Sequence, residues 1–430
     1  MKNLSKFQII VLGVFVLFIA LGVAAFATFK GSSSKSTLPA ITVWGTFPQS
    51  TFENYVAKIN LTLASQLSIN YIEKDKATFS QEFVAALARG TGPDAILIPA
   101  DMLLPHLDKI TPIPYTALPE RTFMDTYVQE GEVYLGQNGI YAIPFAVDPL
   151  VMYWNRDIFS SVGLATYPKY WEDFTAINKK ITTVDQNSNI GRSALAMGDF
   201  SNVVNARELL GSLMLESGNP VTYGVGNNIQ SAFSKDPSVV PAVQFFTQAV
   251  DPTGTNYSWN RGMQDSKTDF LSETLATYFG FASELKDIQA KNPNLNFDVA
   301  PLPQFHNSAT KALYGKLYGL SIVRTSPNQN AVYQIFSLLT SAANIGTLSQ
   351  SMYLPSVRRD IIASGSTDPY ITVFNQQALL AKTWFDADPT VSSSIFGNMV
   401  DAVTSGAKSV RDAVAGANDQ YNAALKQAVQ

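Results

Sequence analysis

The sequence predicts an α/β fold in which helices cover a parallel β-sheet. Short apolar segments at residues 41–44, 67–72 and 95–98 have the length of buried strands. Two amphipathic segments lie between them, so strand and helix alternate along the chain in the pattern of βαβ units. The chain has 430 residues, of which 46% are hydrophobic and 15% charged, and this length predicts two or three globular domains.

Each of the two intervening segments begins with a helix-capping pattern. Ser50 and Glu53 match the capping box S-x-x-E, and Thr78 and Gln81 match its T-x-x-Q form. Apolar residues at helical spacing follow both patterns, and Gly90 marks the expected end of the second helix.

Further helices are predicted in the rest of the chain. One ends at Ile181, and another begins at Ser326 with a proline at its first position. Residues 396–429 are rich in alanine and have the pattern of one long helix. Asn155 is expected to cap a short helix that ends before Gly163.

The N-terminal segment predicts a membrane anchor or a signal. Residues 7–29 are 23 consecutive uncharged residues, long enough to cross the hydrocarbon core of a bilayer as a helix. Lys2 and Lys6 precede them and favour a cytoplasmic N-terminus. We therefore expect residues 1–30 to be an uncleaved anchor, through which the chain contacts the lipid bilayer.

A cleaved secretory signal is the alternative. The sequence Ala25-Phe26-Ala27 fits a cleavage site, so the chain could instead be secreted after cleavage near Ala27. Residues 31–37 form a serine-rich linker. Both interpretations place residues 30–430 on the exoplasmic side of the cell membrane, either as a single-pass protein or as a secreted one.

Composition excludes several classes of function. The absence of cysteine excludes disulfides, thiolate nucleophiles and zinc–thiolate sites. The two histidines, His106 and His306, are interpreted as ordinary surface or loop residues. The net charge of −4 gives no reason to propose nucleic acid as a partner. The sequence also lacks a P-loop, a G-x-S-x-G motif and an H-E-x-x-H motif, so no cofactor, no metal and no enzymatic activity are predicted.

Candidate ligand-binding residues follow the predicted parallel strands, because ligands of such sheets bind beyond the carboxyl ends of the strands. Trp44 and Thr46 lie at the end of the first strand, and Asp101 follows the third. An aromatic ring can cover the apolar face of a polar solute, while hydroxyl and carboxylate groups satisfy its hydrogen bonds. The alternative roles are core packing for Trp44 and a helix N-cap for Asp101.

Five segments, in order along the chain, resemble one protein family. The first is residues 91–109, and the second is residues 139–174, which contain Gly-Ile-Tyr-Ala-Ile-Pro and Tyr-Trp-Asn-Arg-Asp-Ile-Phe. The others are residues 270–303, which end in Pro-Leu-Pro, and residues 319–341 and 353–360. Together they resemble the extracellular solute-binding proteins of bacterial ABC importers, in the group that includes maltose- and multiple-sugar-binding proteins.

This resemblance implies a two-lobed periplasmic-binding-protein-like fold with a hinge and an inter-lobe cleft that holds the ligand. Residues 38–149 and 300–342 would form the first lobe, and residues 150–299 and 343–430 the second. Closure of the hinge around the ligand would produce the form that ABC permease subunits in the membrane recognise.

The resemblance also implies three crossings between the lobes, near residues 148–155, 298–303 and 339–353. Asp148 begins the first crossing, beside a proline that favours extended backbone, and it is a candidate ligand-binding residue. Its alternative role is to accept hydrogen bonds from backbone amides at the hinge. Tyr353 follows the third crossing and would cover the rim of the cleft.

Three further aromatic residues complete the predicted site. Tyr153 and Trp154 point to opposite faces of a strand, so at most one of them faces the cleft. Tyr278 presents the same choice with its neighbour Phe279 and is the candidate of that pair.

The chain departs from the family pattern at several positions. It has no lipid-bearing cysteine, so retention at the membrane would depend on the N-terminal anchor. Tyr170 stands where a threonine or serine helix cap is usual, and Glu273 replaces a usual glycine. Phe281 and Ala282 replace the usual small residue and tryptophan, and in many family members that tryptophan lies near the ligand.

The predicted function is therefore extracytoplasmic solute binding for an ABC importer. The aromatic content of 11% favours a carbohydrate as the solute. Two alternatives belong to other classes: a membrane-anchored sensor of the same kind of ligand, and a surface glycosidase that uses two carboxylates.

Overall fold

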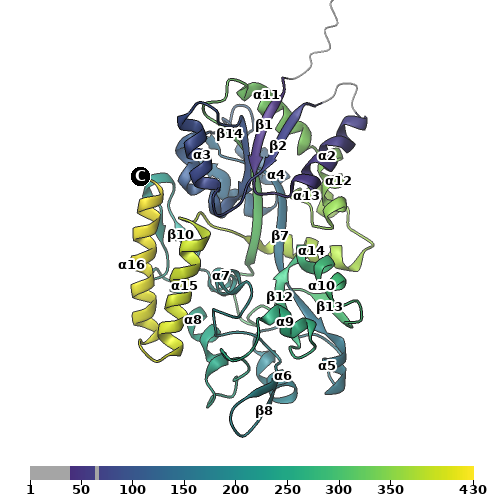
Figure 1. Cartoon of the computed structure of the whole chain (residues 1–430), viewed down its shortest axis with the longest axis vertical. Helices are drawn as coiled ribbons and strands as arrows, with labels where there is room; N and C mark the ends of the chain where they lie inside the picture. Colours follow the sequence, from purple (N-terminus) through teal and green to yellow (C-terminus); the bar gives the residue numbers. More distant parts are fainter. Residues whose placement is uncertain (1–38, 63–66) are drawn as a thin grey trace, which may run out of the picture.

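The computed structural model describes residues 39–62 and 67–430. The predicted anchor at residues 7–29 and the linker at residues 31–37 lie outside the described residues. Within the described ranges, no helix has both the length and the apolar composition that are needed to cross a membrane. The described chain folds into two lobes, one above the other in Figure 1, with two long strands running from one lobe into the other.

A mixed sheet of nine strands passes through both lobes of the described chain. Its main path has the order β12-β7-β14-β3-β1-β2, while β13, β15 and β4 pair beside this path. The strands of this sheet are β1 (Ile41–Gly45), β2 (Ile69–Glu73), β3 (Ala95–Pro99), β4 (Ile110–Thr111), β7 (Ile143–Asn155), β12 (Thr277–Phe281), β13 (Phe297–Ala300), β14 (Leu313–Val323) and β15 (Ala381–Lys382). Short two-stranded ribbons are formed by β5 (Leu135–Gly136) with β6 (Gly139–Ile140), β8 (Thr183–Val184) with β9 (Ile190–Arg192), and β10 (Thr222–Tyr223) with β11 (Gln230–Ser231).

Helices cover the sheet and build most of the lower lobe. The α-helices are α2 (Gln49–Thr62), α3 (Phe79–Ala88), α4 (Glu120–Thr126), α5 (Arg156–Ser161), α6 (Asp173–Ile181), α7 (Ala206–Glu216), α8 (Val240–Thr247), α9 (Ser266–Leu271), α10 (Leu285–Lys291), α11 (Gln329–Leu339), α12 (Ala342–Met352), α13 (Arg359–Ala363), α14 (Pro369–Leu380), α15 (Pro389–Thr404) and α16 (Val410–Ala428). Asp101, Glu130 and Glu284 lie in the short 3-10 helices η1 (Ala100–Met102), η3 (Gln129–Tyr134) and η6 (Ala282–Glu284).

The upper lobe contains the parallel strands that the sequence predicts. β1 pairs in parallel with β2 on one side and with β3 on the other, and β14 runs antiparallel to β3. In Figure 1, α3 lies on one side of these strands and α2 with α12 on the other. Every residue of β3 is buried, as expected for a strand with helices on both faces. The α/β prediction is confirmed here.

The two predicted capping boxes do not form. Helix α2 begins at Gln49, so Ser50 lies inside the helix, and the Gln49 side chain donates a hydrogen bond to Glu53. The Thr78 hydroxyl donates to the carboxylate of Glu82 (2.7 Å), one turn further on, and does not cap α3. In α2 the carboxylate that the capping box would use is thus bound by Gln49, and in α3 the hydroxyl that it would use is bound by Glu82.

The strands β7 and β14 connect the two lobes. From Ile143 to Pro149, β7 pairs with β14, and from Leu150 to Asn155 it pairs with β12 and β13 instead. All thirteen residues of β7 are buried, so this strand belongs to the core of both lobes. The change of partner falls after Pro149, one residue beyond Asp148, which places this aspartate where the lobes meet.

The C-terminal segment forms a helix pair at the side of the molecule, drawn in yellow in Figure 1. The sequence predicts one long helix over residues 396–429, and this is wrong, because the chain turns between α15 and α16. Gly406 adopts a left-handed conformation (φ 73°) that ends α15, and the Ser409 hydroxyl caps α16 by accepting from the Asp412 amide. The predicted cap at Asn155 is confirmed, since its side chain accepts from the Ile158 amide.

The helix predicted to begin at Ser326 starts three residues later. The Ser326 hydroxyl donates to Asp94 (2.6 Å) and accepts from the Asn328 amide, and α11 begins at Gln329. Ser326 therefore fixes the turn that precedes the helix.

Candidate functional site

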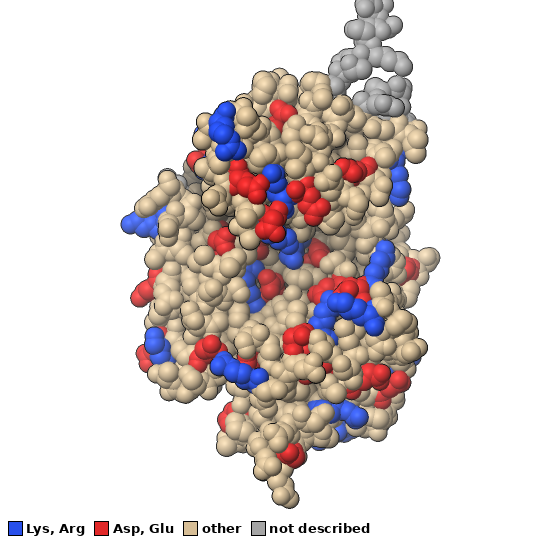
Figure 2. Space-filling model, viewed as in Figure 1, with Lys and Arg blue, Asp and Glu red and all other residues tan. Residues whose placement is uncertain are grey.

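A groove of about 680 Å³ lies in the lower lobe, and one of its lining residues, Arg207, reaches the upper lobe through an ion pair with Asp101 (3.4 Å). Its walls are the loop before α7, the first turn of α7 and one face of α15. Figure 2 shows this side of the molecule hollowed across its middle, with acidic and basic side chains around the hollow. Charged side chains line the groove at Arg207, Glu208 and Asp401. The uncharged polar side chains that line it are Ser201, Asn205, Thr390, Ser393, Ser394 and Asn398.

Arg207 is the centre of a buried charged cluster at the start of α7. Its guanidinium forms ion pairs with Asp386 (2.5 Å), Glu208 (2.9 Å) and Asp101 (3.4 Å). The side chain of Arg207 is 3% exposed, and its guanidinium carbon lies 4.9 Å from the ring centre of Trp384. Because Asp101 follows β3 in the upper lobe and Arg207 belongs to the lower lobe, this cluster joins the two lobes.

Opposite charges in the cluster counteract the effect of burial on Arg207 and Asp386. Burial by itself would lower the pKa of Arg207, but Asp386 and the other nearby carboxylates raise it well above its usual value. Burial raises the pKa of Asp386, and Arg207 opposes this effect. The carboxylate of Asp386 also accepts from the hydroxyl groups of Ser392 and Tyr421. The hydroxyl of Tyr314 donates to Asp101 (2.8 Å).

Asp148 lies near this cluster, on the strand that links the lobes. It is 7% exposed, and its Oδ1 accepts a hydrogen bond from the backbone amide of Ser283 (3.0 Å). Lys316 is its cross-strand partner on β14, and the Lys316 ammonium lies 4.1 Å from the ring centre of Phe281. Burial raises the pKa of Asp148, while Lys316 and the Ser283 hydrogen bond lower it.

Lys76 adds a further cation to the same electrostatic environment. Burial lowers its pKa, and the positive charge of Lys316 lowers it further. Asp101, Asp148 and Glu208 act in the opposite direction. Residues from β3, β7, β14 and α7 therefore interact electrostatically at the meeting point of the lobes.

Several buried oxygen atoms here have no hydrogen-bond partner within the described part of the chain. They are Thr46 Oγ1, Asp101 Oδ1 and both carboxylate oxygens of Glu130. Burial, together with the charges of Asp101 and Asp148, raises the pKa of Glu130 well above its usual value. This environment disfavours the ionised form of Glu130.

Two predicted site residues, Asp101 and Asp148, lie where the lobes meet, and two others, Thr46 and Trp44, lie at the end of β1 in the upper lobe. Asp101 and Asp148 belong to the network described above. Thr46 is buried at the end of β1, next to Phe47, whose ring packs on Tyr318. Trp44 is half-buried, with the ammonium of Lys74 4.0 Å from its ring centre.

None of the eight predicted residues lines the groove, and the other four lie in the core or beside a separate cavity. Tyr153 is fully buried, and its hydroxyl donates to the Phe281 carbonyl (2.7 Å). Tyr278 is also buried, and its hydroxyl donates to Glu284 (2.7 Å). Trp154 packs against Phe159 and is 8% exposed, so both members of the Tyr153–Trp154 pair belong to the core.

Tyr353 lines a separate cavity of about 310 Å³ near α12, α13 and α14. Its backbone is left-handed (φ 60°), and its hydroxyl donates to Asp368. The ammonium of Lys286 lies 5.4 Å from its ring centre. These contacts hold Tyr353 in place without directing it into the groove.

Sequence reasoning missed the residues of the lower lobe that line the groove. Arg207 and Glu208 stand at the start of the helix ARELLGSLMLE, whose other members are almost all apolar, and Asp386 stands in an equally apolar stretch. Charges in such surroundings are a signal, since an unpaired buried charge is costly and each must have a partner. The sequence does not identify that partner, because Arg207 and Asp386 are 179 positions apart.

Comparison with solved structures shows the same fold in several binding proteins. The cyclic alpha-maltosyl-1,6-maltose binding protein from Arthrobacter globiformis is 18% identical, with a TM-score of 0.74, over 90% of this chain and 99% of that one. A cyclo/maltodextrin-binding protein complexed with maltotetraose is 14% identical, with a TM-score of 0.70, over 93% and 99%. The GacH receptor of Streptomyces glaucescens, solved unliganded and with acarbose, is 17% identical, with a TM-score of 0.67, over 90% and 98%.

None of the curated proteins compared with this sequence matches it. The family described as bacterial extracellular solute-binding protein matches residues 50–345, which is more than half of the chain. This match confirms the resemblance found in the sequence, and with it the expectation of a binding protein in place of an enzyme. The chain belongs to the bacterial extracellular solute-binding protein family.

Proposed function

We propose that this protein captures a small carbohydrate in the groove beside the start of α7, over which the upper lobe closes, and delivers it to the permease of an ABC importer. The observation that carries this proposal is the lining of the groove. Hydroxyl and amide side chains from the loop before α7 and from α15 can exchange hydrogen bonds with sugar hydroxyls. The ring of Phe200 lines the same groove and can cover an apolar sugar face.

The upper lobe supports the proposal through its acceptors. Asp101 Oδ1 and Thr46 Oγ1 are buried and have no partner within the described ranges, so each can take a hydrogen bond from an added group. A polyhydroxylated ligand supplies many such donors. Proteins of the same fold are named for binding cyclic maltosyl-maltose or were solved with maltotetraose or acarbose, which supports a sugar over other small solutes.

The two lobes proposed to close on the sugar are residues 38–149 with 300–342, and residues 150–299 with 343–430, except that α12 packs against α2 and so lies with the first lobe (Figure 1). β7 and β14 would serve as the hinge, because they are the strands that pair across both lobes. We further propose that residues 7–29 hold the protein at the outer surface of the cell membrane. Detection of the full chain in the membrane fraction, and its release when residues 1–30 are deleted, would test this anchor.

The test of the function is binding by the purified exoplasmic part of the chain. Thermal unfolding would be measured with a panel of maltotetraose, acarbose, mannotriose, monosaccharides, polyols and amino compounds. A ligand present at 100 times its Kd stabilises the folded state by about 2.7 kcal/mol, a shift that this method resolves easily. We expect at least one oligosaccharide to stabilise the protein. Stabilisation by none of the sugars would contradict the proposal.

A further inference from the structure

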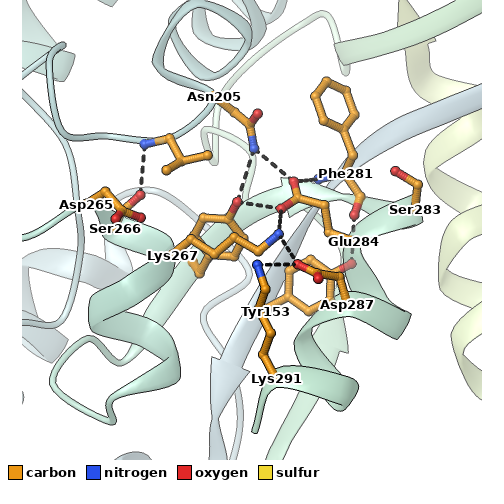
Figure 3. A network of polar contacts seen from close by, with 12 residues as sticks. Tyr153, Asn205, Asp265, Ser266, Lys267, Phe281, Ser283, Glu284, Asp287 and Lys291 are labelled. Atoms are coloured by element: carbon orange, nitrogen blue, oxygen red, sulfur yellow. Dashed lines mark hydrogen bonds and ion pairs between the residues drawn. The ribbon is translucent and has the colours of Figure 1, made fainter.

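The carboxylate of Glu284, in the lower lobe, accepts four hydrogen bonds. Oε1 accepts from the Asn205 side-chain amide (3.0 Å) and from the Phe281 backbone amide (2.9 Å). Oε2 accepts from the Tyr278 hydroxyl (2.7 Å) and from the Lys267 ammonium (2.6 Å). Figure 3 shows Asn205, Lys267 and Phe281 converging on Glu284 from separate segments of the chain. Hydrogen bonds to a charged group are stronger than neutral ones, so these bonds fix the carboxylate relative to the segments that donate to it.

One of the four bonds, from Asn205, holds the turn that precedes α7. Asn205 is the residue before α7, and its backbone is left-handed (φ 61°), a conformation that few residues other than glycine adopt. Its side-chain amide lies within hydrogen-bond reach of the Tyr278 hydroxyl and the Phe279 carbonyl as well as of Glu284. These bonds stabilise the turn from which Arg207 is directed to the floor of the groove.

Another of the bonds fixes the turn that contacts Asp148. Glu284 accepts from the Phe281 amide and thereby closes the turn after β12. Within this turn the Ser283 amide donates to Asp148, and the Phe281 ring lies beneath the Lys316 ammonium. The position of Asp148 and its neighbour Lys316 therefore depends on a turn that Glu284 holds.

A third bond reaches the loop that lines the groove. Lys267 belongs to α9, and the residue before it, Ser266, binds that loop through two hydrogen bonds. The Ser266 amide donates to the Asn202 carbonyl (2.9 Å), and the Ser266 hydroxyl accepts from the Val204 amide (2.9 Å). The segment just before Asn205 is thus connected to Glu284 from a second direction.

Glu284 itself is not one of the residues that line the groove. We propose that Glu284 is a positioning residue of the ligand site, which holds the start of α7 and the Asp148 turn in one fixed arrangement. Ligand affinity then depends on Glu284 although Glu284 does not touch the ligand, because a site is only as well ordered as the residues that support it. This inference rests on the proposed function for the identity of the ligand site.

The primary test is Glu284→Gln, which preserves the shape of the side chain. Its amide group would face the Tyr278 hydroxyl and the Lys267 ammonium, so one pair of bonds is replaced by a conflict between donors. We expect the Kd for the most stabilising sugar among maltotetraose, acarbose and mannotriose to rise at least about tenfold. An unchanged Kd would overturn the proposal.

Lys291→Met is the matched control. Lys291 forms an ion pair with Asp287 (3.1 Å) at the edge of the same network, and Asp287 keeps its contact with Lys267 (2.8 Å) when Lys291 is lost (Figure 3). We expect Lys291→Met to leave the Kd unchanged. An equal loss of affinity in both variants would show a general effect of the network charges and would contradict a special role for Glu284.

A thermodynamic cycle separates positioning from a purely structural role. If Glu284 acts through Asp148, then Asp148→Asn should weaken binding much less in the Glu284→Gln background than in the wild type. If Glu284 only supports folding, the two losses of affinity multiply.

Hydrogen exchange without any sugar provides a readout that does not depend on the ligand. We expect Glu284→Gln to speed exchange of the Ser283 amide and of amides in the first turn of α7, while β1–β3 stay protected. Uniform acceleration, or none, would overturn the positioning role. If no sugar stabilises the wild type, the proposed function fails, while this exchange pattern still decides whether Glu284 positions these segments.

Discussion

Two arginines of the lower lobe each bridge carboxylates, but in opposite surroundings. Arg207 is 3% exposed and pairs with Asp101, Glu208 and Asp386, of which Asp101 belongs to the upper lobe. Arg261 is 66% exposed and pairs with Asp199 (3.0 Å) and Asp401 (2.7 Å), both in the lower lobe. The distances are similar, so geometry does not distinguish the two arginines.

What distinguishes them is the cost of losing the partner. Removal of Arg261 leaves Asp401, which is half-exposed to water, and Asp199, which is buried but keeps two hydrogen bonds from Ser201. Removal of Arg207 leaves Asp386 fully buried and without an ion pair. An ion pair at the surface contributes little to stability, while a buried one cannot be broken without a large loss. The buried cluster is therefore the one that fixes the relative position of chain segments at the floor of the groove.

The largest effect is expected for Arg207→Met. This change removes the cation from three carboxylates and should reduce the free energy of unfolding by about 3–5 kcal/mol. Urea denaturation of the variant and the wild type at neutral pH would measure the difference. A loss below about 1 kcal/mol would mean that the buried carboxylates find other partners, and the contrast with Arg261 would disappear.

The same contrast explains which parts of the site the sequence could predict. Asp101 follows an apolar strand that is visible as a local pattern, so strand order places it at the carboxyl end of that strand. Asp148 interrupts an apolar stretch, and the family resemblance placed it at the first crossing between the lobes. Arg207 and Asp386 meet only through tertiary folding, since they are 179 positions apart. No local pattern carries that information.

The fold, like the site, could be predicted where the signal is local in the sequence and was missed where it is not. The parallel strands β1, β2 and β3 were predictable because their apolar segments and spacing are local. The break at Gly406 was missed because alanine-rich segments on both sides continue one helical pattern, and only the left-handed glycine interrupts it. Tyr153 and Trp154 were placed on opposite faces of their strand, yet both faces are covered, so neither reaches solvent.

A buried carboxyl without an ion pair extends the comparison. Glu216 is 2% exposed and forms no ion pair among the described residues, although the Trp171 indole (3.0 Å) and the Phe305 amide donate to it. Burial raises its pKa from 4.5 to about 7. The folded state therefore holds this proton up to about pH 7, whereas the unfolded chain releases it near pH 4.5.

Stability should consequently fall as the pH rises from 4.5 to 7, because the folded state binds more protons than the unfolded state in this range. We expect Glu216 to account for a loss of roughly 2–3 kcal/mol across this window. Glu216→Gln should remove that part of the pH dependence, as measured by urea denaturation at pH 5 and pH 7. An equal slope in both proteins would show that Glu216 is ionised in the folded state.

Asp148→Asn should separate binding from stability. The asparagine oxygen can still accept from the Ser283 amide, so the turn after β12 is preserved and the free energy of unfolding should change little. The second carboxylate oxygen and the charge are lost, and we expect a ligand sugar to bind at least about tenfold more weakly, a cost of roughly 1.4 kcal/mol. Titration calorimetry would measure this, with the exposed Asp419→Asn as the control. Unchanged affinity would assign Asp148 to the hinge backbone alone.

The smallest effect is expected for Arg261→Met, and it tests the other half of the comparison. Asp199 keeps hydrogen bonds from the amide (2.9 Å) and hydroxyl (2.5 Å) of Ser201 when Arg261 is removed, and Asp401 faces water. Its urea midpoint should therefore stay close to that of the wild type, and any small difference should shrink in high salt, because exposed ion pairs are screened. A large loss that persists in high salt would show that Arg261 supports the lower lobe in a way that its exposure does not reveal. Exposure would then no longer explain why Arg207 and Arg261 differ.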